Sequence, residues 1–280
     1  SLVSLVAHEL AHSWSGNLVT FATDKDAWLN EGFTSYVENR LVEALFGKDQ
    51  ADMEAAIGRA EVVEEYKTLD PKLQRLALEP GDLADPDNSS SATVYQKGAW
   101  FLSFLEQRFG REVFDAWLKG YFDRHAFQSM TTARLVEDLQ QNLLATNPGK
   151  VTDAEIQEWV YGAGIPATAP KVESRRFITV DAARIAWTGS GMLPTQSITG
   201  AWSTQEWVRF LEGMPDALKP EQLRQLDEAY TLTGTPNGEI AQRWYPLAER
   251  SGYTEARAEM GMFLERVGRR KLIMPTYKAL

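Results

Sequence analysis

The stretch Ala7-His8-Glu9-Leu10-Ala11-His12-Ser13-Trp14 determines how the rest of the chain is interpreted. His8 and His12 are four residues apart, so on a helix both imidazoles lie on one face and can bind one metal ion. Glu9 lies further round the helix, where its carboxylate can accept a proton from a water on that metal. The pattern is typical of a zinc site with two histidine ligands and a general base.

A catalytic zinc ion needs a third protein ligand, and the sequence offers Glu31 for that position. The intervening residues 13–30 are enough for a turn and a second helix that passes the metal. The alternative is that both histidines are core residues whose ring nitrogens are satisfied by hydrogen bonds. Histidine is scarce, with three in 280 residues, so a chance match to the motif is improbable. We therefore expect one Zn²⁺ per chain.

The composition limits the class of protein. A hydrophobic content of 44% with nine Trp and twelve Phe predicts well-filled globular cores, and 280 residues suffice for two domains. A net charge of −10 argues against a nucleic-acid partner, and no apolar run approaches the ~18 residues of a membrane span. The chain has no cysteine, which leaves His and Glu as the plausible zinc ligands.

Apolar residues at helical spacing predict a nearly all-α chain. The first helix is expected to continue as far as Trp14 and to stop at Gly16-Asn17, and the second carries Glu31 and Glu38 on one face. An irregular stretch is expected from Asp70 to Thr93, and a linker over 162–170. The other predicted helices cover 50–68, 95–109, 111–123, 131–145, 153–161, 179–187, 203–213, 220–232, 237–250 and 254–267, with capping boxes at Thr152/Glu155 and Ser203/Glu206.

The zinc-helix motif followed by Trp28-Leu29-Asn30-Glu31-Gly32 resembles the gluzincin aminopeptidases of peptidase family M1. Asp85-Pro86-Asp87, Tyr95-Gln96-Lys97-Gly98 and Gly268-Arg269-Arg270-Lys271 resemble its leukotriene A-4 hydrolase-like branch. The similarity runs from the first helix to the last ten residues. It implies a mainly α fold: the helical half of a thermolysin-like zinc peptidase catalytic domain at 1–165, followed by an α-helical solenoid or bundle domain at 172–280.

The resemblance also implies roles for individual residues. His8, His12 and Glu31 would bind zinc, and Glu9 would be the general base. Tyr95 would donate its hydroxyl to the oxyanion of the tetrahedral intermediate; the alternative is an ordinary tyrosine at a helix start. Glu38 would orient a ligand histidine through its second ring nitrogen, the alternative being a solvated carboxylate.

Three further residues are expected to contact substrate. Arg269 and Lys271 match a basic pair that holds the carboxylate of a short peptide, and in an extended segment both would face one way. A cationic run near a helix C-terminus is the alternative. Asp87 matches a carboxylate that lines the pocket for the substrate's N-terminal side chain, or is simply a turn residue.

Two departures from the family pattern refine the prediction. Ser90 stands where the epoxide-hydrolysing member has a second tyrosine, which disfavours epoxide hydrolysis. The family's Gly-x-Met-Glu-Asn motif, which binds the substrate α-amine upstream of the zinc helix, does not occur. We therefore expect the C-terminal portion of a zinc aminopeptidase acting on short peptides. Its partners would be its own N-terminal and β-rich parts, and its location cytoplasmic, with a periplasmic or secreted one left open. A zinc endopeptidase and an inactive helical scaffold remain alternatives.

Overall fold

A computed structural model describes residues 2–83 and 91–280 and confirms the mainly α prediction. The chain divides into two compact units, Ser1–Ser174 and Arg175–Leu280. The division falls just after the linker predicted over 162–170, and the domain limits of 1–165 and 172–280 stay predictions. Among the described helices, none is long and apolar enough to cross a membrane.

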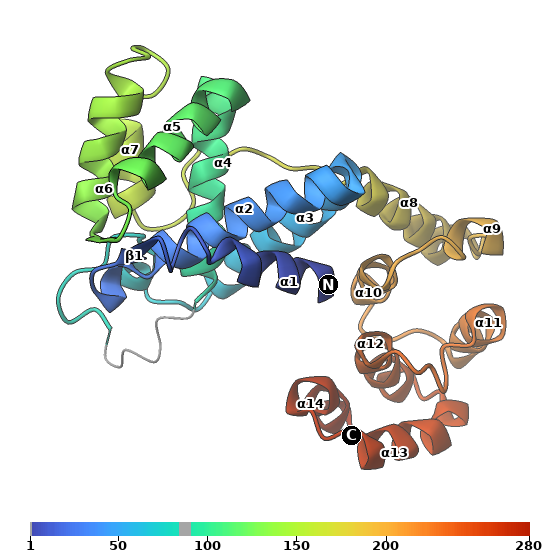
Figure 1. The fold of residues 1–280 in the computed structure, drawn as a ribbon. Coiled ribbons are helices and arrows are strands. Elements are labelled where there is room, and N and C mark those ends of the chain that lie inside the picture. The colour runs from blue at the N-terminus through green and yellow to red at the C-terminus, as the bar shows by residue number, and fades with distance from the viewer. Residues whose placement is uncertain (1, 84–90) are drawn as a thin grey trace. The chain divides into compact units, whose positions relative to one another are not determined.

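The first unit consists mainly of helices and also contains a two-stranded parallel sheet (Figure 1). Its α-helices are α1 (Leu2–Ala11), α2 (Trp28–Phe46), α3 (Lys48–Glu65), α4 (Gly98–Phe109), α5 (Arg111–Arg124), α6 (Thr132–Leu139) and α7 (Asp153–Tyr161). Short 3₁₀ turns η1 (Asp24–Asp26) and η2 (Pro71–Gln74), π-helical turns η4 (Thr93–Lys97) and η5 (Gln140–Leu144), and strands β1 (Val19–Phe21) and β2 (Gln128–Met130) complete it.

Helix α1 ends earlier than the apolar pattern predicted, at Ala11 instead of near Trp14. The backbone tightens there, because Ser13 and Trp14 donate their N–H groups to carbonyls three residues back, at Leu10 and Ala11. His12 still donates its backbone N–H to the His8 carbonyl at 3.2 Å. The two imidazoles therefore stay one turn apart on the same side of the helix.

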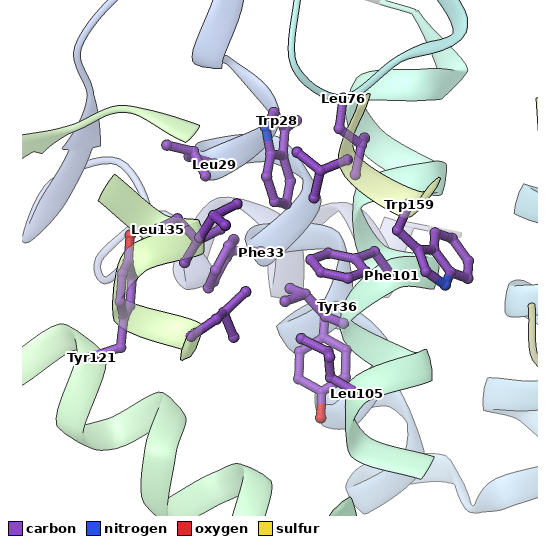
Figure 2. Close-up of a cluster of buried hydrophobic side chains, with 14 of the residues drawn as sticks. Trp28, Leu29, Phe33, Tyr36, Leu76, Phe101, Leu105, Tyr121, Leu135 and Trp159 are labelled. Carbon is purple, nitrogen blue, oxygen red and sulfur yellow. The ribbon is translucent and has the colours of Figure 1, made fainter. Parts of the chain in front are cut away.

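Helix α2 is the centre of the first unit, and its buried side anchors the core shown in Figure 2. The Trp28 ring packs edge-on against Phe101 of α4, with 6.0 Å between ring centroids, and Phe33 stacks on Tyr121 of α5 at 5.4 Å. The Trp28 indole N–H donates to the Thr132 hydroxyl at 3.0 Å. Aromatic packing on both sides thus holds α2 rigidly, and with it any side chain on its opposite face.

The second unit is a set of helices around its own core of Trp187, Phe210, Trp244, Tyr245 and Phe263. The capping boxes predicted at Thr152/Glu155 in the first unit and Ser203/Glu206 in the second are both present. The elements of the second unit are α8 (Arg175–Ser190), α9 (Gln196–Thr199), α10 (Thr204–Glu212), α11 (Pro220–Tyr230), α12 (Gly238–Arg250), η6 (Thr254–Ala256), α13 (Arg257–Arg266) and α14 (Arg270–Ala279).

The last helix corrects an expectation. The segment with Arg269 and Lys271 was predicted to be extended, yet Lys271 lies in the first turn of α14 and only Arg269 keeps an extended backbone, at φ −76° and ψ 107°. Leu272 and Ile273 pack against the core of this unit, and this tertiary contact favours a helix. The basic residues lie between the end of α13 at Arg266 and the first turn of α14, so the alternative of cations near a helix C-terminus stays open.

Helix α1 presents an apolar face outwards. Val3, Leu5, Val6 and Leu10 are 44–60% exposed, whereas Ala7 and Ala11 on the inner side are buried. Apolar side chains this close together on one helix face are more typical of an interface than of a solvated surface. Only the inner face of α1, which carries the imidazoles, is packed within the part of the chain that the structure describes.

Candidate active site

The side chains of His8, His12 and Glu31 converge between α1 and α2. Glu31 Oε2 lies 3.2 Å from His8 Nε2 and 3.5 Å from His12 Nε2. Among the described residues, these three are the one group of His and acidic side chains whose donor atoms cluster closely enough to bind a metal ion together. All three side chains are partly buried, between 13% and 25% exposed.

Hydrogen bonds on the second ring nitrogens orient both imidazoles so that their Nε2 atoms face Glu31. His12 Nδ1 donates to the carbonyl oxygen of Ser15 at 2.9 Å, and because a carbonyl only accepts, the proton must be on Nδ1. His8 Nδ1 lies 3.1 Å from a carboxylate oxygen of Glu38. Orientation of this kind by an outer acceptor is usual for metal-binding histidines.

The distances fit a zinc ion. Two ligand atoms bound to one tetrahedral zinc at 2.0–2.1 Å lie about 3.3 Å apart, which is close to the 3.2 and 3.5 Å found between Glu31 and the two imidazoles. Two imidazoles and one carboxylate also match the donor set of catalytic zinc sites, where a fourth position stays open. His8, His12 and Glu31 would therefore hold the ion.

The same carboxylates make His8 strongly basic. Hydrogen bonds to Glu31 and then Glu38 raise the pKa of His8 to about 9, against the opposing effect of burial. A proton and a metal ion compete for the Nε2 lone pair, so metal binding at this site displaces a proton.

Glu9 and Tyr95 lie next to this cluster. Glu9 follows His8 on α1, and its side chain is exposed to solvent. The Tyr95 ring stacks near His8, with 6.0 Å between the ring centroids. Burial raises the pKa of the Tyr95 hydroxyl, and the Glu31 and Glu9 carboxylates raise it further. Tyr95 therefore keeps its proton at neutral pH and can donate a hydrogen bond beside the metal ligands.

A buried lysine holds the π-helical turn that carries Tyr95. Lys97 is fully buried, and its Nζ donates to the carbonyl oxygens of Gln74 at 2.7 Å and Gly162 at 2.9 Å. Burial lowers the pKa of Lys97 to about 7, with a smaller opposing effect from Glu158. An uncharged amine retains two N–H groups, which is sufficient for both carbonyls. The turn is thus joined to two distant segments of the first unit.

The other predicted site residues are not brought to this cluster by any described contact. Arg269 and Lys271 belong to the second unit, at the start of α14. The Lys271 carbonyl accepts a hydrogen bond from Gln242 at 2.9 Å. Asp87 and Ser90 lie outside the described residues.

Sequence reasoning missed two residues that support the site. Thr34 lies three residues after Glu31, and its hydroxyl is 3.2 Å from His12 Nδ1 and 2.6 Å from the Ser15 hydroxyl. Helical spacing from Glu31 is the signal that could have identified Thr34. Lys97 belongs to the Tyr95-Gln96-Lys97-Gly98 motif, but the sequence analysis assigned it no role. No local pattern predicts its burial, because the carbonyls that it binds are distant in the sequence.

A helix pair that presents two imidazoles and a carboxylate around one point, with a free glutamate beside them, defines a zinc-hydrolase type of metal centre. Comparison with known families gives the more specific assignment. Residues 1–159 match the Peptidase family M1 domain, and residues 202–280 match the leukotriene A4 hydrolase C-terminal domain. The chain belongs to peptidase family M1.

Known relatives agree with this assignment. Leucine aminopeptidase 2 of Yarrowia lipolytica is 31% identical over 99% of this chain and 46% of its own length. Aminopeptidase B of Rattus norvegicus is 32% identical over 100% of this chain and 45% of its own length. Yeast LTA4 hydrolase, solved in complex with bestatin, superposes with a TM-score of 0.82 at 25% identity, covering 99% of this chain and 48% of that chain. The chain spans about half the length of these relatives.

The role of Glu38 can be tested through metal affinity. Replacing it, as Glu38→Ala, removes the acceptor from His8 Nδ1, and we expect zinc to bind about 10–100-fold more weakly. Competition with a chromophoric chelator measures the affinity. Glu112→Ala, which changes an exposed glutamate at the start of α5, is the matched control and should bind zinc like the unmodified chain. Equal affinities for the two variants would contradict the role of Glu38.

The buried Lys97 predicts a pH dependence of stability. Its folded pKa of about 7 lies below the ordinary value of 10.5, so between these values the unfolded chain binds a proton that the folded chain does not. The free energy of unfolding should therefore rise with pH in this window. From pH 7 to pH 9, the free energy of unfolding of the unmodified chain should rise by on the order of 2 kcal/mol more than that of Lys97→Met.

Urea denaturation of both proteins at the two pH values measures this difference. Lys119→Met removes an exposed lysine of α5 and keeps Lys97, so as the control it should gain the same stability between the two pH values as the unmodified chain. A difference between the unmodified chain and Lys97→Met that stays constant with pH would show that Lys97 titrates normally.

Proposed function

We propose that this chain is the zinc-binding helical portion of an aminopeptidase that removes N-terminal residues from short peptides. The observation that carries the proposal is the convergence of His8, His12 and Glu31, whose ligand atoms lie within 4.8 Å of one another, with Glu9 left free on α1 and Tyr95 beside His8. The relatives named as aminopeptidases support the substrate class. Zinc bound to these ligands would polarise the scissile carbonyl and lower the pKa of a water.

The residues of the chain would share the proton transfers. Glu9 is exposed and next to a ligand histidine, so its carboxylate can accept the proton of the attacking water and deliver it to the leaving amine. Tyr95 donates its O–H to the oxygen on which negative charge develops. Because its raised pKa keeps that proton in place, Tyr95 stabilises the transition state without changing its own charge.

Substrate contacts are proposed for three residues. Arg269 and Lys271 would hold the carboxylate of a short peptide. Arg270 and Lys271 oppose the helix dipole at the start of α14, so the stability of that helix does not explain them. Asp87 would line the pocket for the substrate's N-terminal side chain. A cytoplasmic location is proposed as well, on the expectation drawn from the sequence.

The general-base role is tested by Glu9→Gln, which keeps the size of the side chain and removes its basicity. We expect about one zinc per chain and a loss of turnover of about 10²–10⁴-fold. Elemental analysis after dialysis and hydrolysis of an aminoacyl p-nitroanilide measure the two quantities. Glu112→Gln on the surface of α5 is the control and should retain both. Full activity in Glu9→Gln would refute the general-base role.

The choice between aminopeptidase and endopeptidase depends on the substrate's amine. The same peptide is assayed with a free and with an N-acetylated terminus, and we expect the free form to be cleaved at least about 10²-fold faster, as for a site that binds a charged group. Equal rates would indicate an endopeptidase. A chain without zinc, and without uptake of zinc on reconstitution, would indicate the inactive scaffold.

A further inference from the structure

Helices α2 and α4 touch backbone to backbone at a pair of glycines. A Cβ placed on Gly32 would lie 2.8 Å from the Cα of Gly98, and a Cβ on Gly98 would lie 2.9 Å from the Cα of Gly32. Neither glycine has a positive φ. Glycine is therefore needed at both positions because of the space between the helices and for no reason of backbone conformation.

This contact lies directly beside two groups of the candidate active site. Gly32 follows the ligand Glu31, and Gly98 lies three residues after Tyr95, at the junction of the π-helical turn and α4. Trp28 supports the contact, since its ring would be 3.3 Å from a Cβ on Gly98 and is itself packed against Phe101. A change in the spacing of the two backbones would therefore move Tyr95 relative to Glu31.

The turn that carries Tyr95 has little freedom to adjust on its other sides. The Gln96 side chain reaches Gly58 of α3, where a Cβ would lie 2.0 Å from its oxygen. Lys97 Nζ binds the carbonyl oxygens of Gln74 and Gly162. Because Gln96 and Lys97 are held on these other sides, we expect a displacement at the glycine contact to reach Tyr95.

We propose that the Gly32–Gly98 contact sets the distance between the Tyr95 hydroxyl and the metal ligand Glu31, which makes both glycines positioning residues. Ordinary carbon–carbon contacts are about 3.5–4.0 Å, so a methyl group at either position would separate the helices by about 1 Å. A displacement of that size at a catalytic group can lower the rate about 10²-fold. The inference rests on the proposed roles of Tyr95 and Glu31.

The test compares Gly98→Ala and Gly32→Ala with Gly261→Ala. Gly261 is in α13, and a Cβ there meets nothing within 4 Å, so the control adds the same methyl group in open space. For the first two variants we expect kcat to fall about 10–100-fold, with KM and the zinc content unchanged. Gly261→Ala should retain the activity of the unmodified chain.

A double-mutant cycle separates positioning from general damage to the fold. If Gly98 acts through Tyr95, Gly98→Ala should lower kcat in the unmodified chain and have no further effect in Tyr95→Phe. An equal loss in both backgrounds would overturn the proposal.

A spectroscopic readout is independent of turnover. In ¹³C-tyrosine-labelled protein, the Tyr95 ring signal is assigned by its loss in Tyr95→Phe, and zinc alone is then added. The signal should shift on zinc binding in the unmodified chain and in Gly261→Ala, and shift less in Gly98→Ala and Gly32→Ala. Identical shifts in all four proteins would overturn the inference.

This experiment tests the glycine contact separately from the proposed peptidase function. A chain that cleaves no peptide but shows the expected difference in zinc response would refute the proposed function and support the glycine contact. Circular dichroism checks the fold of each variant, and if one does not fold, the other tests the contact from the opposite helix. If neither folds, the glycines serve folding and the positioning role is wrong.

Discussion

The candidate site depends on two carboxylates of α2 that bind one imidazole of α1 from both of its nitrogens. Glu31 lies 3.2 Å from His8 Nε2 and Glu38 lies 3.1 Å from His8 Nδ1. Two partly buried carboxylates this close to each other need a positive charge between them, which a protonated His8 or a metal ion provides. This interaction attaches α1 to α2, while the opposite face of α1 keeps its apolar side chains exposed.

The two ligand histidines are oriented by acceptors of different charge. His8 has the Glu38 carboxylate, whereas His12 has the neutral Ser15 carbonyl and the Thr34 hydroxyl. A carboxylate acceptor makes an imidazole a stronger electron donor than a carbonyl does. The Glu31 and Glu38 carboxylates place negative charge around the position that a zinc ion would take. The site is thus suited to a divalent cation in a partly buried position, where unbalanced charge is unfavourable.

The parts of the site that follow helical spacing were predictable from the sequence, and the parts that depend on tertiary contacts were not. His8 and His12 are four residues apart, and Glu31 and Glu38 are seven apart on one helix face, so their convergence needs only two packed helices. Lys97 binds carbonyls of Gln74 and Gly162, which no local pattern connects to it. Helix α14 was missed for the same reason, since Leu272 and Ile273 are ordered by packing on the second core.

Lys97 and Gly98 are both unfavourable choices for stability alone. A glycine in a helix is less stable than alanine by about 1 kcal/mol, and a buried ammonium group loses its hydration, which is why burial lowers the pKa of Lys97. Both residues lie within three positions of Tyr95, and each joins its turn to a separate part of the first unit. Alanine at 98 and methionine at 97 suit a helix and an apolar core by intrinsic preference, although a Cβ on Gly98 would meet the Gly32 Cα at 2.9 Å. They could not give the close backbone approach to α2 or the two hydrogen bonds that hold the turn. The close approach at Gly98 and the two hydrogen bonds of Lys97 thus both hold the turn for which the role of Tyr95 is proposed.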